Sequence, residues 1–489
     1  MVIVCLNRPE YRNDVAEEIR LFLGLVEIVF VDAESEISRQ QNVEGTLVLT
    51  LLRDRLQGTV EGSMGEERVK SSFTIPDEQP LTIKKHEKRN LKLTAFTLLK
   101  KNDPQVETPW GSLTGIRPTK LFRELSTESC EASAEWEFGE TFSVTPDKIQ
   151  LAKTICHVQK PYIESAQPKD LDIYIGIPFC RTRCLYCSFA SEVLRAPELL
   201  VSYLSGLKKD ILAGAEIVRD GGYHVRAMYI GGGTPTVLST EQLRELLTFA
   251  FDAYGGYGNE CTVEAGRPDT IDAEKLKLLK ALGVDRISIN PQTMNDETLR
   301  RIGRAHTVEE TIAAYRLARE IGFSSINMDV IAGLPGETVE DMSHTYAQIG
   351  LLQPDNLTVH ALAIKRSSLL KKQLESWPLP SAQEAEQMIA DGRSLADALG
   401  MQPYYMYRQK YMSGNLENVG YAAPDKICMY NIDMMEETVS ILSHGAGSMT
   451  KRVFAGQNRI ERQPNPKDVP TYLEKLPLLM ERKRRFFLD

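Results

Sequence analysis

Three cysteines within eight residues are the side chains in this sequence best suited to binding metal. They stand in IPFCRTRCLYCSF as Cys180, Cys184 and Cys187, with the spacing C-x3-C-x2-C. Thiolates are the usual ligands of iron–sulfur clusters, and three thiolates on a four-iron cluster leave one iron for a small-molecule ligand. A structural zinc site more often has four ligands in paired C-x2-C knuckles, and the sequence has no second knuckle. We therefore predict a [4Fe–4S] cluster here, with zinc as the alternative.

The segment IGGGTPT, from Ile230 to Thr236, directly follows a predicted strand. Three successive glycines let the backbone approach a ligand closely and adopt positive φ. A tight turn between a strand and a helix would use the same residues. Its position at the C-terminal end of a strand favours a ligand site, because that edge carries the site in barrel-like α/β folds.

Two carboxylates occupy equivalent places further along the chain. Glu264 ends the third predicted strand, in TVEAGRP, and Asp329 lies within the fifth, in INMDVIAGLPGET. A carboxylate is costly to bury unless it is paired, so each either binds ribose hydroxyls or pairs with an Arg or Lys. Gln292 follows the fourth strand. Arg304, in RRIGRAH, could bind a carboxylate with two hydrogen bonds or remain a solvated helix charge.

The elements that position these residues alternate between strand and amphipathic helix from Leu171 onward. Such alternation predicts a parallel sheet or barrel, and six units predict a partial barrel rather than a complete eight-unit one. The expected strands are 173–177, 227–230, 262–265, 286–289, 326–331 and 356–360. The expected helices between them are 199–213, 240–253, 272–282, 308–321 and 339–352.

The predicted fold class is α/β, and the chain is predicted to contain four regions. These are a small N-terminal α/β domain (1–125), a helical connector (126–170), the partial barrel (171–370) and a mainly helical C-terminal region (371–489). In the first region we expect β-rich runs at 2–6, 26–31, 46–52, 69–75 and 91–99, and a helix at 14–25.

The bulk composition excludes several classes of protein. The 489 residues carry a formal net charge of -9, which argues against nucleic acid as the main partner. The apolar runs are far shorter than the roughly 20 residues of a membrane-spanning helix, and MVIVCLNRPEYR does not resemble a secretory signal. We therefore expect a cytoplasmic protein without a membrane span. The five other cysteines are predicted to be small buried residues: Cys5, Cys130, Cys156, Cys261 and Cys428.

Together, five segments of the chain resemble the radical S-adenosylmethionine (SAM) proteins related to oxygen-independent coproporphyrinogen III oxidase. They are YIGIPFCRTRCLYCSF, IGGGTPT, VEAGRPD, RISINPQTMNDETLRRIGRAH and MDVIAGLPGET. Two more, TPWGSLTGIRPTKLF and YYMYRQKYMSGNLENVGYA, resemble an oxidase-like bacterial branch of that family. The resemblance implies the radical SAM fold, a partial (β/α)6 barrel, with the C-terminal region covering the substrate site.

The resemblance also implies roles for the matching residues. Cys180, Cys184 and Cys187 would hold the cluster, while one SAM chelates its open iron through amino and carboxylate groups. The positions that match contacts of this SAM are Tyr174, Gly232, Glu264 and Ala363. Those that match a second SAM or substrate pocket are Tyr186, Gly233, Thr234, Gln292, Arg304 and Asp329. Tyr186, Gln292 and Arg304 are the candidates for catalytic residues.

The implied activity is an oxygen-independent oxidative decarboxylation in haem biosynthesis. An electron from the reduced cluster cleaves SAM, and the 5′-deoxyadenosyl radical takes a hydrogen from the β-carbon of a substrate propionate. Loss of carbon dioxide and an electron leaves a vinyl group, and two such events convert coproporphyrinogen III into protoporphyrinogen IX. The implied partners are this porphyrinogen and a reductant such as flavodoxin or ferredoxin. Arg408 and Lys410 are candidates to bind propionates, or else ordinary surface charges.

One position departs from the oxidase pattern. Where the oxidase branch has a further cysteine, two residues after the third, this chain has Phe189. Phenylalanine there is typical of the haem-binding chaperone branch, which keeps the cluster without decarboxylase activity. The histidine-containing C-terminal motif of that branch is not evident in YRQKYMSGNLENVGYA. We therefore expect an oxidase-like enzyme, with a haem chaperone as the alternative.

Overall fold

The computed structural model describes residues 1–24, 26–32, 45–187, 192–194, 196–365, 368–371, 377–409, 415–454, 457 and 459–489. The chain divides into two compact units, Met1–Ala152 and Lys153–Asp489, each of which has its own internal packing. The finer division into four regions stays a prediction.

The first unit is built on a five-stranded sheet in the order β2-β1-β3-β4-β5. β1 is parallel to β2 and β3, and the remaining pairs are antiparallel. An apolar core lies between this sheet and the helices α1 and α2. The elements are β1 (Val2–Leu6), α1 (Arg12–Leu23), β2 (Ile28–Val31), β3 (Gly45–Asp54), β4 (Gln57–Met64), β5 (Glu67–Thr74), α2 (Pro80–Asn102), α3 (Pro118–Glu128) and α4 (Glu131–Trp136).

The prediction of a β-rich run at 91–99 is wrong, because these residues lie within α2. Leu91, Ala95, Leu98 and Leu99 are all buried, and their spacing of four, three and one residues places them on one face of a helix. The other runs predicted to be β-rich in this unit correspond to strands wherever the structure describes them.

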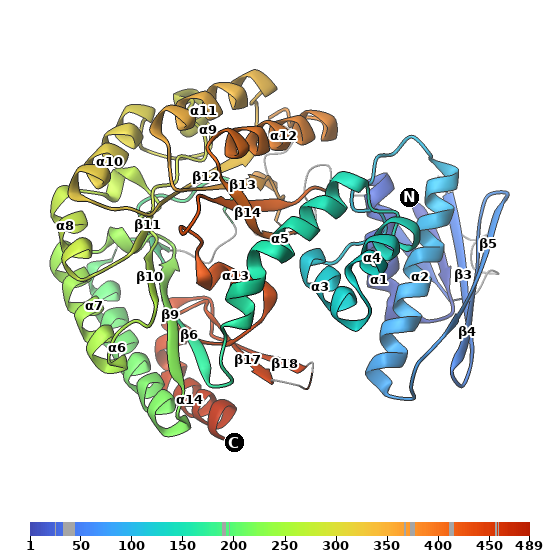
Figure 1. Ribbon diagram of the computed structural model, residues 1–489, viewed down its shortest axis with the longest axis horizontal. Coiled ribbons are helices and arrows are strands. Elements are labelled where there is room, and N and C mark those ends of the chain that lie inside the picture. Colours follow the sequence, from blue (N-terminus) through green and yellow to red (C-terminus); the bar gives the residue numbers. More distant parts are fainter. Residues whose placement is uncertain are drawn as a thin grey trace. The chain divides into compact units, whose positions relative to one another are not determined.

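The second unit contains six parallel strands in consecutive spatial order, from β6 to β13. Figure 1 shows α6 to α11 following one another around the outside of these strands. The strands are β6 (Asp170–Ile177), β9 (His224–Gly232), β10 (Glu260–Val263), β11 (Arg286–Ser288), β12 (Ile326–Ala332) and β13 (Asn356–Ala361). The helices are α6 (Pro197–Gly221), α7 (Thr240–Tyr254), α8 (Ala273–Ala281), α9 (Asp296–Arg301), α10 (Val308–Ile321) and α11 (Val339–Leu352). Each predicted strand of the barrel is confirmed.

The C-terminal region extends the sheet at both ends as well as adding helices. β14 and β15 follow β13, while β16, β17 and β18 follow β6, so the eleven-stranded sheet has two free edges. Its helices contain more residues than its strands, but these five strands were not predicted from the sequence. The elements are α12 (Ala382–Ala398), β14 (Gln402–Tyr407), β15 (Asn418–Ala422), α13 (Met429–Glu436), β16 (Ser440–His444), β17 (Met449–Phe454), β18 (Arg459–Pro464) and α14 (Val469–Leu488).

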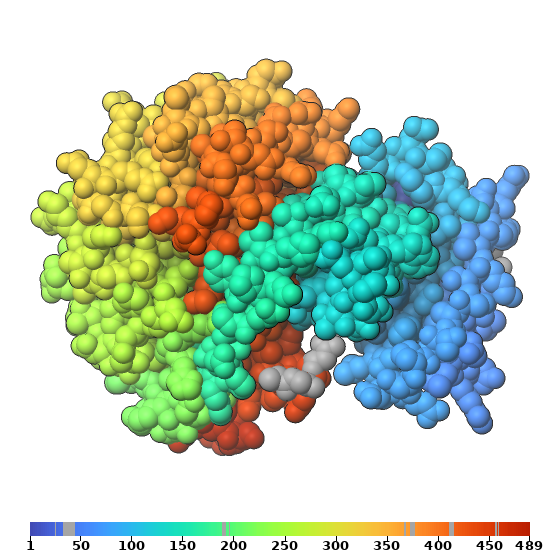
Figure 2. All heavy atoms as spheres, viewed as in Figure 1, coloured from blue at the N-terminus to red at the C-terminus, as the bar shows by residue number. Residues whose placement is uncertain are grey.

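The inner side of the curved sheet is filled by aromatic and apolar side chains. Tyr404, Tyr405 and Tyr430 are buried there in one cluster with residues of β9 and α13, and part of α5 (Pro146–Glu164) packs against it through Val158 and Tyr162. Figure 2 shows atoms of the C-terminal region, in orange, filling the space within the arc of yellow and green helices. The parallel strands are therefore packed between helices on the outside and apolar side chains on the inside, and this packing positions the strand ends.

Helix starts are encoded locally at the edge where the parallel strands end. Capping boxes begin three barrel helices, with Ser239 before α7, Thr307 before α10 and Thr338 before α11. In each box the N-cap side chain and the third helical residue satisfy one another's free backbone N–H groups, which contributes about 1 kcal/mol. These boxes fix where each loop from the preceding strand must end.

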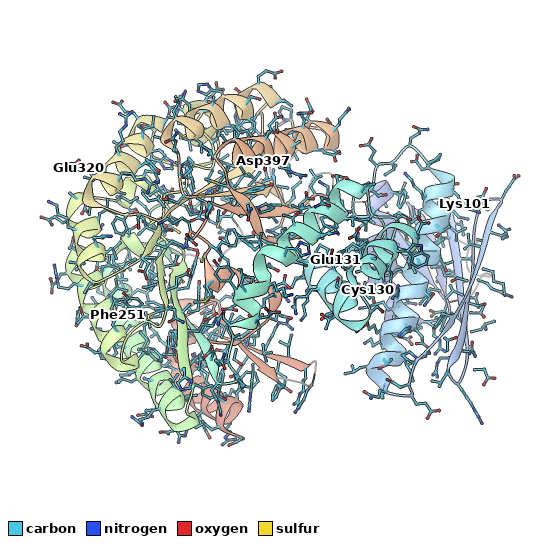
Figure 3. All side chains as sticks on the ribbon, viewed as in Figure 1. Lys101, Cys130, Glu131, Phe251, Glu320 and Asp397 are labelled. Atoms are coloured by element: carbon cyan, nitrogen blue, oxygen red, sulfur yellow. The ribbon has the colours of Figure 1, made fainter. Side chains whose placement is uncertain are left out.

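Three of the five cysteines expected to be buried are buried, namely Cys5, Cys261 and Cys428. Cys156 is half-buried, whereas Cys130 is exposed, so that prediction is wrong for Cys130. Figure 3 labels it beside Glu131, at the start of the short helix α4, where the chain has too little covering structure to bury it. Among the described residues, no helix combines the length and apolar character needed to span a bilayer.

Candidate functional site

The three predicted metal-binding cysteines lie on one loop that follows β6. β7 (Phe179–Cys180) begins the loop and pairs in parallel with β8 (Glu192–Val193). The loop is tied to the segment after α9 by a hydrogen bond from Leu185 N to Ile302 O of 2.9 Å. Cys184 is buried, while Cys180 and Cys187 are half-buried. The sequence therefore places one sheltered and two accessible thiols at the edge where the parallel strands end.

Hydrogen-bond donors lie beside two of these thiols. The Thr234 hydroxyl lies 3.5 Å from Cys180 Sγ, and Nη1 of Arg267 lies 4.0 Å from Cys184 Sγ. Both would stabilise negative charge on sulfur, as ligation of a metal cluster requires. Among the described residues, no group of three or more His, Cys, Asp or Glu side chains is arranged to hold a single metal ion. A cluster places each thiolate on a different iron, so its cysteines need not converge on one point.

The glycines of IGGGTPT allow β9 to approach the cysteine loop closely. A Cβ on Gly233 would lie 3.0 Å from Cys180 Sγ and 2.5 Å from the Phe179 carbonyl oxygen. Gly232 has a φ of +111°, which side chains rarely adopt, and a Cβ there would meet the Ile177 backbone at 3.1 Å. Only glycine fits both positions. This close approach, together with the thiol donors, fits a cluster held beside the end of β9.

Glu264 and two tyrosines form the adjoining part of the site. Tyr229 donates a hydrogen bond of 2.6 Å to Glu264 Oε1 and stacks on Tyr174, with ring centroids 6.2 Å apart. Burial raises the pKa of Glu264 to about 7, and the hydrogen bonds from Tyr229 and the Gly232 backbone partly oppose this rise. The structure therefore brings together Tyr174, Gly232 and Glu264, as predicted from the sequence. The residue that links Tyr174 to Glu264 is Tyr229, which was not predicted. Tyr229 was missed although it lies two residues before Gly231 on the same strand face.

The residues predicted to line a second pocket lie in two parts of the candidate site. Arg304 donates from Nη1 to Asn290 O at 2.6 Å and from Nη2 to the Tyr186 hydroxyl at 3.4 Å. Burial alone would lower the pKa of Arg304, but the charges of Tyr186 and Cys184 raise it overall. Arg304 is thus a buried cation beside the cysteine loop, and its interpretation as a solvated helix charge is wrong.

Gln292 and Asp329 form the other part. Gln292 N donates to Asp329 O at 2.9 Å, and Gln292 has a φ of +68°, a conformation that is uncommon for a residue with a side chain. Burial alone would raise the pKa of Asp329, but His360 lowers it, since its Nε2 lies 3.8 Å from Asp329 Oδ2. His360 Nδ1 also lies 3.3 Å from the Tyr407 hydroxyl. Sequence spacing alone left His360 without a role.

The remaining predicted residues lie at or near the same edge. Thr234 belongs with Cys180 rather than with Gln292, and Ala363 lies two residues beyond the end of β13. Arg408 is buried and donates from Nη2 to Asn415 O at 2.9 Å, so its interpretation as a surface charge is wrong. Lys410 and Phe189 lie outside the described residues.

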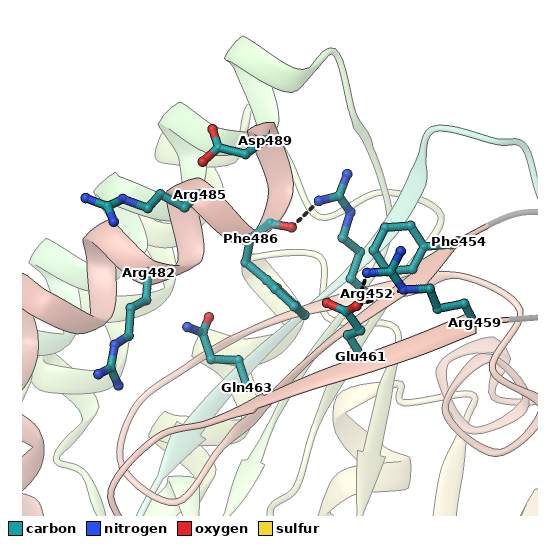
Figure 4. A pocket seen from close by; sticks show the side chains of 9 residues that line it. All are labelled: Arg452, Phe454, Arg459, Glu461, Gln463, Arg482, Arg485, Phe486 and Asp489. Carbon is teal, nitrogen blue, oxygen red and sulfur yellow. Dashed lines mark hydrogen bonds and ion pairs between the residues drawn. The ribbon is translucent and has the colours of Figure 1, made fainter. Parts of the chain in front are cut away.

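Two hollows lie apart from the thiols. One, of about 20 Å³, lies inside the sheet between Tyr229, Arg286 and Tyr404, with room for about one water molecule. The other, of about 450 Å³, is lined by four arginines and two phenylalanines of β17, β18 and α14 (Figure 4). It lies beside Phe454, beyond the strand end where Ser440 pairs with Leu171, whereas the cysteine loop follows the opposite end of β6. This hollow and the cysteine loop therefore lie at opposite ends of β6.

Comparison with known proteins agrees with this geometry. The radical SAM superfamily model matches residues 174–349. The chain is 35% identical over 472 residues to the oxygen-independent coproporphyrinogen-III oxidase-like protein HemZ of Bacillus subtilis, covering 95% of this chain and 94% of that protein. The chain belongs to this oxidase-like family of radical SAM proteins. Its cofactors are accordingly a [4Fe–4S] cluster and SAM.

The family also contains proteins with a different function. The chain is 34% identical over 236 residues to the haem chaperone HemW of Bacillus subtilis, covering 47% of this chain and 61% of that protein. The structure of the coproporphyrinogen III oxidase HemN from Escherichia coli has a TM-score of 0.52 and 24% identity, and the match covers 66% of this chain and 73% of HemN. This likeness confirms the radical SAM fold and the predicted fold class.

Proposed function

We propose that this protein is a radical SAM enzyme that oxidatively decarboxylates the propionates of coproporphyrinogen III to vinyl groups. The observation that carries the proposal is the loop with Cys180, Cys184 and Cys187 at the strand ends, beside the Tyr174–Tyr229–Glu264 group. The extent of the similarity supports the oxidase-like branch of the family, because the match to the oxidase-like protein HemZ covers 95% of the chain whereas the match to HemW covers 47%.

In this proposal each residue set has a distinct task. The three thiolates hold the cluster, which supplies, when bound, the electron that cleaves SAM into methionine and the hydrogen-abstracting 5′-deoxyadenosyl radical. Gly232 and Gly233 let the backbone approach the cluster and SAM closely. Glu264 would accept hydrogen bonds from the ribose hydroxyl groups of SAM.

The second set of residues handles the substrate end of the site. Arg304, held against Tyr186, orients a carboxylate, and Gln292 with Asp329 binds polar groups of a second SAM or of the substrate. For each vinyl group formed, the substrate would give a hydrogen atom to the radical and release carbon dioxide and one electron. That electron balances the one used to cleave SAM, so SAM would be the net oxidant. Tight packing of the interior excludes water from the radical. A flavodoxin or ferredoxin would supply the reducing electron in the cytoplasm, where cysteines stay reduced.

The alternative function is haem transfer by a chaperone of the same family. Phe189 at the position of the oxidase's further cysteine, and the similarity to HemW, favour it. A chaperone would bind haem and leave porphyrinogen unchanged.

An anaerobic turnover assay tests the proposal. Full-length protein with reconstituted cluster is incubated with SAM, a reductant and coproporphyrinogen III, and the products are identified by mass spectrometry. We expect 5′-deoxyadenosine together with loss of carbon dioxide from the porphyrinogen. Tight haem binding with unchanged porphyrinogen would establish the chaperone function instead.

Serine substitution of one loop cysteine tests the assignment of the cluster ligands. In Cys184→Ser we expect the iron content and SAM cleavage to fall by at least about tenfold. Mutation of residues that only support a metal ligand commonly lowers metal affinity by about this factor, and Cys184 would be a ligand itself. The matched control is Cys130→Ser, which removes an exposed thiol of the first unit. Equal iron content in both variants would contradict the assignment.

A further inference from the structure

Cys184 lies beside two buried arginines. Nη1 of Arg267 is 4.0 Å from its Sγ. The second is Arg304, whose pKa burial alone would lower but the charges of Tyr186 and, next, of Cys184 raise. Both arginines are more than nine-tenths buried, at 3% and 8% exposure, so solvent screens their charge only weakly. Cys180, in contrast, receives the neutral hydroxyl of Thr234. One thiol of the loop is therefore in a strongly cationic environment.

Arg267 is held rigidly in its position. Its Nε and Nη2 donate to the two oxygens of Asp269 at 3.0 and 3.1 Å, which is a two-pronged ion pair. Its Nη1 donates to the Thr182 hydroxyl at 2.7 Å and to the Thr182 carbonyl at 3.2 Å, both on the cysteine loop. Each of the three guanidinium nitrogens thus donates either to Asp269 or to the loop. The side chain can neither swing into solvent nor move away from the sulfur without breaking several buried hydrogen bonds.

Asp269 is the negative partner in this arrangement. Burial alone would raise its pKa, but the nearby His306 and the hydrogen bonds from Arg267 hold the pKa below its usual range, so the carboxylate is charged. His306 is buried, with Nδ1 at 3.8 Å from Asp269 Oδ1, and Arg181 donates to the Asp269 carbonyl at 2.6 Å. The thiol of Cys184 therefore experiences a near cation whose field is partly cancelled by a carboxylate on the far side.

We propose that Arg267 and Asp269 together set the reduction potential of the cluster, acting as positioning residues through Cys184. Reduction adds one negative charge to the cluster, so a nearby cation stabilises the reduced form and a nearby anion destabilises it. Arg267 raises the potential, and Asp269 limits that rise while orienting the guanidinium. Hydrogen bonds to the ligand sulfurs and charges near them are known to set the reduction potentials of iron–sulfur clusters.

The proposal rests on ligation of the cluster by Cys184, and it does not depend on the substrate. The potential is measured without porphyrinogen, so a failure to observe decarboxylation would leave the proposal intact. If no cluster ligated by Cys184 were found, both this proposal and the proposed radical SAM activity would be contradicted.

The experiment is an anaerobic redox titration of the full-length protein, followed by electron paramagnetic resonance of the reduced cluster. Two variants are predicted to shift the midpoint potential in opposite directions. Arg267→Gln removes the cation and shifts it to a more negative value, while Asp269→Asn removes the anion and shifts it to a more positive one. With a fixed weak reductant, the reduced fraction falls in R267Q and rises in D269N.

A purely structural role for the pair predicts a different result. Loosening the loop would lower the iron content in both variants and leave the midpoint of the loaded fraction unchanged, or shift it in the same direction in both. Either result would overturn the proposal. Arg300→Gln is the control, because Arg300 is an exposed arginine of α9 that bonds within its own helix, and we expect an unchanged potential.

Should R267Q fail to take up iron, D269N alone decides. Asparagine keeps the size of the side chain and one oxygen acceptor for Arg267, so the loop contacts at Thr182 are retained. A more positive potential in D269N then supports the proposal, and an unchanged or more negative one overturns it.

Discussion

At the scale of single residues, the site depends on groups that are costly to bury and that find partners. Glu264 is half-buried directly after the end of β10, and partial burial raises the pKa of its carboxyl to about 7 from a usual 4.5. A carboxyl near its midpoint at neutral pH can accept hydrogen bonds as an anion or donate one as an acid. Tyr229 keeps it oriented by a hydrogen bond of 2.6 Å.

This raised pKa predicts a pH dependence of stability in the cofactor-free protein. The folded state holds a proton on Glu264 that the unfolded state releases above pH 4.5, so stability falls as the pH rises from 4.5 to about 7. The loss is at most about 3 kcal/mol, from 1.36 kcal/mol for each pKa unit. In Glu264→Gln this loss is absent, so urea unfolding at pH 5 and pH 8 should show wild type losing stability relative to the variant. Parallel pH profiles would contradict the account.

Residue types predicted part of the site and missed another part. The cysteines, Glu264 and Asp329 were found because thiols at close spacing and carboxylates in apolar strands are unusual. Tyr229, Arg267 and His360 were not assigned roles, because an isolated tyrosine, arginine or histidine has no spacing pattern and acts here through neighbours distant in sequence.

At the scale of elements, the turn after β9 lies directly against the cysteine loop. Gly233 has no side chain, and a Cβ would lie 2.5 Å from the Phe179 carbonyl oxygen and 3.0 Å from Cys180 Sγ. Backbone atoms cannot move aside as the end of a flexible side chain can, so β7 or the turn would have to shift.

Gly233→Ala is therefore expected to damage the cysteine loop specifically. We expect a severalfold loss of iron content, since overpacking of a close contact costs about 1 to 3 kcal/mol. Gly115→Ala is the matched control, because a Cβ there meets no atom within 4 Å. Iron determination on both variants checks this, and equal loading would show that the close approach is unimportant.

The elements of the barrel could be predicted because strand and helix alternate with caps and glycines at their ends. The run at 91–99 was misassigned because its β-forming residues follow a helical period, with Leu91, Ala95 and Leu99 buried on one face. The strands β14 to β18 were missed because they form by extending the sheet beyond β13 and β6. These partner strands are distant in the sequence, so the pairing leaves no local sequence pattern.

At the scale of the whole second unit, the last helix is anchored to the barrel by a buried ion pair. Lys483 of α14 contacts both oxygens of Asp210 of α6, at 2.7 and 2.9 Å, and donates to Ser443 O at 2.6 Å. Burial alone would raise the pKa of Asp210, but Lys483 and His444 hold it below its usual range. β16, which includes Ser443, pairs with the strand that leads to the cysteine loop.

Removing one partner of this pair should destabilise the unit strongly. In Lys483→Met the Asp210 charge stays buried without its cation, at a cost of about 3 to 5 kcal/mol. The double variant with Asp210→Asn should recover much of that loss, since no unpaired charge remains. Urea unfolding at neutral pH measures both, and equal stability of the single and double variants would contradict the role of the buried charge.

Transfer of a labelled hydrogen measures the central claim most directly. Coproporphyrinogen III deuterated at the β-carbons of its propionates is supplied anaerobically to the reduced protein with SAM. The account predicts deuterium in the 5′-deoxyadenosine, formed in step with vinyl groups and abolished in Cys184→Ser. Unlabelled 5′-deoxyadenosine with intact propionates, from protein that carries its cluster, would contradict it.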